Sequence, residues 1–157
     1  MKKISLFVSL SFLVLFLLVG CVKREAPLVK YGDNNDWVNY SSDNYGNVYS
    51  YKMKNIQNNG GKYIVQVWEK EVYSDKGEEE IIQKMTKNGL STEGYNKLKE
   101  TMSLYEIDCN KKMKNISSIT DYDMEGKVLL SYSYDKKEWG FIVPDSKVDS
   151  FRKEVCK

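Results

Sequence analysis

The sequence predicts an α+β domain: an antiparallel sheet of about six strands in meander order, with a C-terminal helix packed on it and a short peripheral helix. Three observations support this fold class. Apolar and polar residues alternate along several runs of strand length within residues 37–134. Short segments rich in Asn, Asp and Gly separate these runs, which is typical of hairpins. Two stretches, residues 78–88 and 145–156, instead have the charge and apolar pattern of helices.

The N-terminal residues resemble a bacterial lipoprotein signal. Two lysines precede an apolar run over residues 4–19, which is shorter than the roughly 20 residues that a membrane-spanning helix needs. The run ends in Leu-Val-Gly-Cys, the pattern of a lipobox, so we expect cleavage before Cys21 and acylation of its sulfur. A signal peptide cleaved elsewhere and an uncleaved anchor helix are the alternatives.

The chain is therefore expected to have three parts. Residues 1–20 form the signal peptide and residues 21–36 a lipid-anchored tether, because the latter have no periodicity and collect Pro, Gly, Asp and Asn. The fifteen residues from 22 to 36 extend to at most about 50 Å. Residues 37–157 form the folded domain.

The strands are expected within this domain. A turn at residues 58–61 reads Asn-Asn-Gly-Gly, and these residue types tolerate the positive φ of a hairpin. Alternation is cleanest in the last run, where we expect the four apolar side chains at positions 128, 130, 132 and 134 to point inward. The predicted strands are residues 37–40, 47–53, 62–73, 101–109, 112–120 and 127–134.

The two helices have different expected roles. Residues 78–88 begin with acidic and end with basic side chains, which complements the helix dipole, but they have few apolar positions and so predict a peripheral helix. In residues 145–156, Ser146 and Asp149 resemble a capping box. Apolar residues at 148, 151 and 155 form a stripe that can pack on the sheet.

The chain has three cysteines, an odd number for an exported protein. If Cys21 carries lipid, Cys109 and Cys156 remain, and two thiols in an oxidising compartment can form a disulfide. That bond would join the C-terminal helix to a strand and contribute on the order of 4 kcal/mol by loop closure. A redox-active dithiol is the alternative, which the absence of Cys-x-x-Cys spacing disfavours.

Charge and composition exclude several function classes. There are 24 basic and 22 acidic residues, and because Lys2 and Lys3 lie in the signal, the remainder is neutral. A neutral chain has no electrostatic footprint for nucleic acid. Histidine is absent, which removes the usual general base and the commonest zinc ligand. We therefore expect a protein that is not an enzyme and has no metal site and no cofactor.

Two patterns that could be mistaken for sites support this expectation. Residues 121–126 begin like a calcium-binding loop, but Tyr132 occupies the position of the bidentate glutamate, so a hairpin turn is favoured. Glu69 and Glu71 share a strand face, and we expect a charged, solvated surface there rather than a catalytic pair. The 12 tyrosines and three tryptophans are expected mainly in the core, although rings on an exposed sheet face would suit binding. No individual binding residue can be assigned.

A set of blocks spread over residues 37–156 resembles the surface-adhesin protein E family. The two most specific blocks are Leu-Tyr-Glu-Ile-Asp-Cys at 104–109 and residues 139–146 together with the terminal cysteine. The resemblance implies an antiparallel sheet with a C-terminal helix. It also implies an outer-membrane lipoprotein that binds host extracellular-matrix and serum proteins. The segment from residue 78 to 98 departs from the family pattern.

These observations lead to a functional expectation. The protein is expected to be a lipid-anchored binding module of the bacterial cell envelope, in the outer membrane or at the cell surface. Its partners would be membrane lipid, through acylated Cys21, and a host or environmental extracellular protein. The alternative is an accessory envelope lipoprotein that faces the periplasm, and a small hydrolase is a distant third because histidine is missing.

Overall fold

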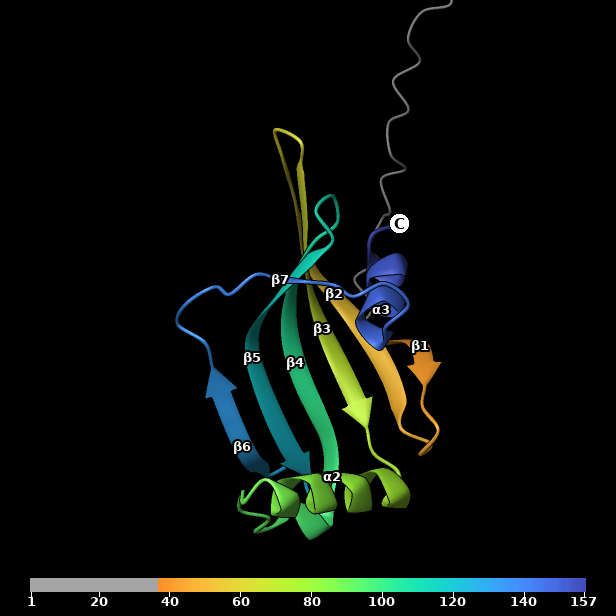
Figure 1. Cartoon of the computed structure of the whole chain (residues 1–157), viewed down its shortest axis with the longest axis vertical. Helices are drawn as coiled ribbons and strands as arrows, with labels where there is room; N and C mark the ends of the chain where they lie inside the picture. Colours follow the sequence, from red (N-terminus) through yellow and green to blue (C-terminus); the bar gives the residue numbers. More distant parts are fainter. Residues whose placement is uncertain (1–36) are drawn as a thin grey trace, which may run out of the picture. The chain divides into compact units, whose positions relative to one another are not determined.

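The computed structural model describes residues 37–157, and the predicted signal, tether and lipid-attachment residue Cys21 lie outside the described residues. The described chain forms seven strands, two helices and a 3₁₀ turn (Figure 1). In chain order the elements are β1 (Val38–Ser42), β2 (Val48–Asn59), β3 (Lys62–Val72), α2 (Asp75–Lys87), η1 (Tyr95–Lys97), β4 (Leu98–Asp108), β5 (Met113–Asp123), β6 (Val128–Ser133), β7 (Gly140–Phe141) and α3 (Lys147–Val155). Within these residues no helix is both long and apolar enough to cross a membrane.

The sheet is an antiparallel meander over its first six strands. Each of β1 to β6 pairs with the strand that precedes it in the chain, so the spatial order equals the sequence order. The seventh strand, β7, departs from this order because it pairs with β5 beside the end of β6. The predicted α+β class and meander are therefore correct for β1 to β6, and the predicted count of about six strands misses β7. A two-residue strand carries no alternation pattern that a sequence could display.

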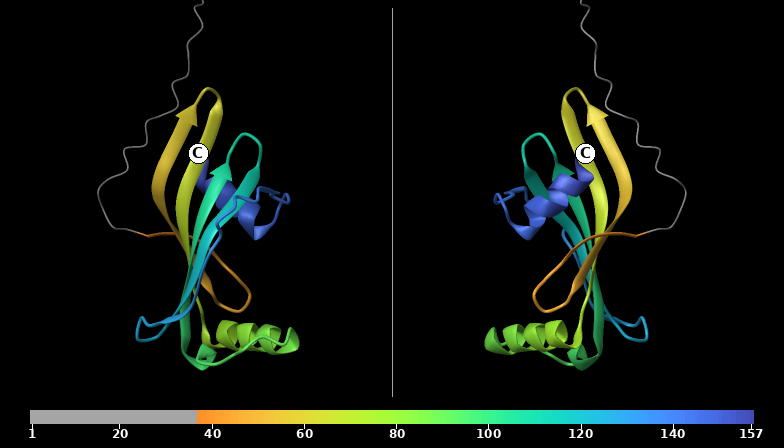
Figure 2. Two further views of the ribbon diagram at one scale, coloured as in Figure 1. Left: turned by 90° about the vertical axis from the view of Figure 1, so that its left-hand side faces the viewer. Right: turned by 90° about the vertical axis from the view of Figure 1, so that its right-hand side faces the viewer.

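Both helices lie on the same side of the sheet (Figure 2). On that side, Val65 and Val67 of β3 face Tyr105 and Ile107 of β4, and all four are buried. Phe151 of α3 fills the space above them and is 1% exposed. Burying an aromatic or branched side chain in this way stabilises the fold by about 1.5–3 kcal/mol each, so the sheet and α3 share one core.

The helix α3 has the N-cap and the apolar stripe that the sequence predicts, but it spans Lys147–Val155 rather than residues 145–156. Ser146 is its N-cap, and its hydroxyl accepts a hydrogen bond from the backbone N–H of Asp149 at 3.2 Å. The apolar stripe packs on the sheet, with Phe151 and Val155 buried and Val148 partly buried. Hydrogen bonds from Lys153 and Arg152 hold the pKa of the Asp149 carboxyl far below its usual range.

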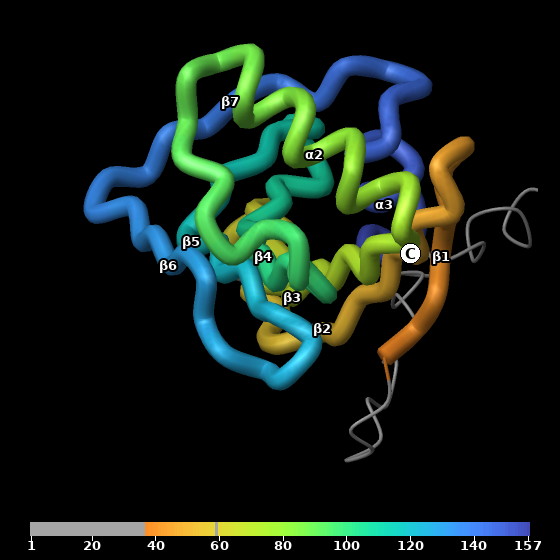
Figure 3. The backbone as a smooth tube through the Cα atoms, turned by 90° about the horizontal axis from the view of Figure 1, so that it is seen from below, coloured from red at the N-terminus to blue at the C-terminus, as the bar shows by residue number. Residues whose placement is uncertain are grey.

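The helix α2 is longer than predicted and lies at one end of the sheet (Figure 3). It begins at residue 75 rather than 78, because Ser74 is its N-cap and accepts a hydrogen bond from the backbone N–H of Gly77 at 3.1 Å. Gly77 is its only buried residue. The helix is peripheral, as the shortage of apolar positions predicts.

Candidate binding surface

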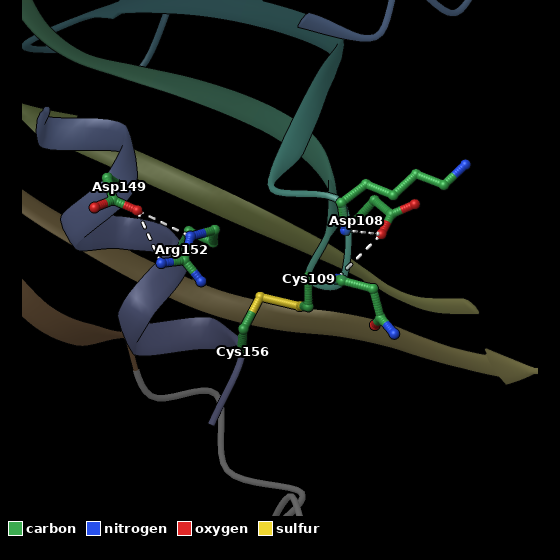
Figure 4. The surroundings of a disulfide bond; sticks show 7 residues. Asp108, Cys109, Asp149, Arg152 and Cys156 are labelled. Atoms are coloured by element: carbon green, nitrogen blue, oxygen red, sulfur yellow. Dashed lines mark hydrogen bonds and ion pairs between the residues drawn. A yellow bond between two sulfur atoms is a disulfide. The ribbon is translucent and has the colours of Figure 1, made fainter. Parts of the chain in front are cut away.

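The two cysteines that the sequence pairs are joined in the structure (Figure 4). Cys109 directly follows β4 and Cys156 directly follows α3, and their Cα atoms lie 5.7 Å apart. The Asp108 carboxylate accepts backbone hydrogen bonds from Asn110 at 3.1 Å and Lys111 at 2.9 Å, which closes the turn after Cys109. The disulfide thus holds the end of α3 against the core, which is the position of a structural disulfide.

Glu69 and Glu71 do not form the solvated charged surface that the sequence favoured. Both face the helices, and Glu69 is only 6% exposed. Glu69 accepts a hydrogen bond from the hydroxyl of Tyr40. The Lys147 Nζ at the start of α3 lies 3.8 Å from Glu69 and 3.7 Å from Glu71. The alternation of β3 predicts that the two glutamates share a face, but it cannot tell which face α3 covers.

Neighbouring tyrosines complete this polar cluster. The Tyr49 hydroxyl lies 2.7 Å from Glu71 Oε1 and 2.8 Å from Asp43 Oδ2. Burial and these two hydrogen bonds raise the pKa of Tyr49 far above its usual value, so its hydroxyl stays protonated and acts as a donor. The Lys147 Nζ lies 3.8 Å from the Tyr49 ring. Because its carboxylates are engaged by side chains of the fold, the cluster is best explained as a connection between α3 and the sheet.

The segment that resembles a calcium loop is a turn. Asp121 accepts hydrogen bonds from Tyr95 and Thr101, each at 2.6 Å, which fixes η1 to the sheet. Asp123 accepts backbone hydrogen bonds from Glu125 at 2.9 Å and Lys127 at 2.7 Å, which closes the β5–β6 hairpin. The oxygens at the first and third positions of the motif are therefore occupied by the fold itself.

The strand β6 presents its apolar side chains to solvent rather than to the core. Val128, Leu130, Tyr132 and Tyr134 are 48%, 50%, 57% and 45% exposed, so the prediction that they point inward is wrong. The rings of Tyr132 and Tyr134 meet edge to face, with centroids 4.7 Å apart. The physical reason is the position of the strands in the sheet. The apolar side chains of α3 cover β3 and β4, whereas β6 lies at the edge of the sheet, outside this cluster.

A groove of about 530 Å³ adjoins this exposed strand. It is formed where α2 and the segment that follows it approach the start of β6. Most of its lining is apolar, and Glu93 and Lys127 provide charges. The lining residues are Met85, Leu90, Ser91, Glu93, Gly94, Tyr95, Lys127, Val128, Leu129 and Leu130. No sequence pattern predicts this groove, because its walls come from separate segments. The signal in the sequence is Leu90, an apolar residue within a polar stretch, which is 58% exposed.

Within residues 37–157, no strand pairs with the outer edge of β6. The strand bonds to β5 on one side, and the Tyr134 N–H donates to the Ser117 carbonyl at 3.0 Å. Because ladder hydrogen bonds alternate along an antiparallel strand, the backbone groups of Ser131 and Ser133 point to the opposite, outer edge. The strand Val-Leu-Leu-Ser-Tyr-Ser contains neither proline nor a charged residue, the features that usually block pairing at sheet edges.

Comparison with known proteins identifies a family. The profile of a family described as surface-adhesin protein E matches residues 37–157, the same residues that the structure describes. No curated protein matches the chain, and no solved structure matches it.

Proposed function

The chain belongs to the surface-adhesin protein E family, and from this premise we propose that it is a lipid-anchored binding module of the cell envelope. It engages an extracellular protein through the β6 surface, which we define as Val128, Leu130, Tyr132, Tyr134 and the adjoining groove. One observation carries this assignment: these side chains remain exposed on a sheet whose central strands bury theirs in the core.

The chemistry of the β6 surface favours a protein partner. Tyrosine is one of the residue types enriched at the energetically important positions of protein interfaces, and neighbouring apolar side chains help to exclude water from them. Contiguous apolar patches on a protein surface mark interaction sites more often than isolated exposed residues do. The contact would depend mainly on apolar burial, so its affinity should survive added salt better than that of an exposed ion pair.

The lipid anchor completes the proposed function. Acylation of Cys21 would hold the protein to the membrane, and residues 21–36 would be a tether of at most about 50 Å. Export by residues 1–20 and lipid attachment together would place the domain on the envelope, where an extracellular protein can reach it.

The test is binding of the soluble chain, expressed from Val22 onward, to immobilised extracellular-matrix and serum proteins at low and high salt. Tyr132→Ala should weaken saturable binding about ten-fold or more, as expected for an interface hot spot. Tyr45→Ala is the matched control, because Tyr45 is 44% exposed on the β1–β2 turn, away from the β6 surface.

Two outcomes would contradict the proposal. If no matrix or serum protein binds saturably, the adhesive role is wrong. If Tyr132→Ala binds as well as the unchanged chain, the β6 surface is not the contact. Protease treatment of intact cells distinguishes this function from the alternative. A surface adhesin would be cleaved, whereas a periplasm-facing accessory lipoprotein would be protected from digestion.

A further inference from the structure

Charge is segregated between the two faces of strands β1 to β3, although the chain as a whole is nearly neutral. The only carboxylates on these three strands are Glu69 and Glu71, and both lie on the helix-covered face with Val65 and Val67. Alternation therefore places Lys70 on the opposite face. Lys52 pairs across from Trp68 on that same opposite face. We call this side of β1 to β3, which no helix covers (Figure 2), the basic face; it ends at β4, where the same side of the sheet carries Glu100, Glu106 and Asp108.

Two tryptophan rings on the basic face each contact the ammonium group of a lysine. The Lys70 Nζ lies 4.4 Å from the ring centroid of Trp37, and the Lys54 Nζ lies 5.7 Å from that of Trp68. Neither Lys54 nor Lys70 has a carboxylate within 4.0 Å among the described residues. Each tryptophan thus combines an apolar ring with a neighbouring cation that forms no ion pair with a described carboxylate.

The basic face is also where the preceding chain joins the domain. Trp37 is the first described residue, and it follows residues 21–36 directly. Those residues reach at most about 50 Å from Cys21. A protein held at Cys21 can therefore bring the β1 edge, and the basic face beside it, to the membrane with less extension of the tether than the β6 edge needs.

We propose that the basic face docks on an anionic phospholipid surface, with Lys52, Lys54 and Lys70 near the headgroups and Trp37 and Trp68 at the interface. Lysines are attracted to the negative potential of such a surface, and tryptophan rings favour the boundary between headgroup and hydrocarbon. This orientation rests on the proposed anchoring at Cys21. It leaves the β6 surface, at the other edge of the sheet, directed away from the lipid and open to a partner.

The experiment uses the chain from Val22 onward, without lipid, because the core formed by the described residues is drawn from residues 40–156. Flotation with phosphatidylcholine vesicles, with and without phosphatidylglycerol, measures partitioning at low and high salt. Binding should require the anionic lipid and should fall as salt rises. Quenching of tryptophan fluorescence by brominated lipid should accompany it, and Trp37→Phe should reduce that quenching.

Charge variants identify the face. Each lysine near an anionic surface should contribute about five-fold to partitioning, so the triple variant K52Q/K54Q/K70Q should bind about 100-fold more weakly. The matched control is K76Q/K87Q/K136Q, which removes the same charge from exposed lysines elsewhere and should bind normally. Thermal unfolding of both variants shows whether they remain folded. If a variant does not fold, the lipid and salt dependence of the unchanged chain still tests the proposal.

Three outcomes would overturn the inference. The first is equal binding to neutral and anionic vesicles, or binding to neither. The second is equal loss in both triple variants. The third is binding to a sulfated polysaccharide without binding to anionic vesicles, which would make the basic face a polysaccharide site. Binding of the protein partner is measured separately, so loss of vesicle binding with intact partner binding would reject membrane docking and leave the proposed adhesive function standing.

Discussion

Gly77 shows how a single residue joins two elements. It lies inside α2, where glycine is less stable than alanine by about 1 kcal/mol. The structure explains why glycine is there: a Cβ at this position would collide with the side-chain amide of Asn47. That amide is held in place, since its oxygen accepts from the Ser74 N–H at 3.1 Å and its nitrogen donates to Asp43 at 3.0 Å.

Gly77→Ala should therefore destabilise the protein by about 1–3 kcal/mol, because Asn47 must move and lose hydrogen bonds. In an exposed helix the same change would stabilise. Urea unfolding monitored by circular dichroism measures the difference. Gly140→Ala is the control, since a Cβ there meets nothing within 4 Å, and it should be nearly neutral. A stabilised Gly77→Ala protein would contradict the close approach.

Tyrosines illustrate what residue type alone leaves undecided. Tyr49 and Tyr105 are buried at 5% and 8% exposure, and Tyr40 donates to a buried carboxylate. Tyr132 and Tyr134 have similar β-rich neighbours in the sequence and are exposed. A phenol ring suits a core with a hydrogen-bond acceptor as well as a binding surface. The strand's position in the sheet decides between the two.

At the scale of elements, α3 is held by an apolar stripe, a polar cluster and a covalent bond. Phe151 packs against Tyr40 and Tyr105, with ring centroids 5.1 and 5.6 Å apart. Lys147 connects its first turn to the glutamates of β3. The disulfide fixes its end to β4, across 47 residues of sequence. Three independent kinds of contact thus hold α3 on the sheet.

Removing the disulfide should cost about 2–5 kcal/mol, because the unfolded chain regains the entropy that closure of a 47-residue loop removes. Cys109→Ser and Cys156→Ser should lower the free energy of unfolding equally, and the double variant should lose no more than either single one. Denaturant unfolding of the oxidised protein checks this. Two alkylatable thiols in freshly purified, unreduced protein would show that the bond does not form.

At the scale of the whole molecule, the proposed lipid anchor should determine where the protein is located without affecting the stability of its folded domain. Cys21→Ser should abolish lipid attachment, because the acyl group needs the thiol, and should release the protein from membranes or stall its precursor. Fractionation and acyl labelling of cells measure this. The folded domain should keep its melting temperature, since the described core contains no residue before Tyr40. A Cys21→Ser protein that still carries acyl label would contradict the lipoprotein proposal.

Much of the fold could be predicted from local chemistry. The alternation of polar and apolar residues identified the strands, and Asn-Gly turns predicted the hairpin that joins β2 to β3. The serine before α3 and its apolar stripe predicted a packed C-terminal helix. Cysteine counting paired Cys109 with Cys156. All of these signals arise from a few consecutive residues or from simple arithmetic, so they are present in the chain before it folds.

The candidate site depended on tertiary structure. The alternation in β6 is as clear as in β3, yet β3 is central and buried whereas β6 is an edge strand and exposed. Glu69 and Glu71 were expected in solvent and lie under α3. Period-two alternation states that a strand has two different faces, but what covers a face is decided by segments far away in the sequence. The sequence by itself therefore determined the elements, their order and the disulfide. Only the packing of α2 and α3 decided which side chains remain free to bind.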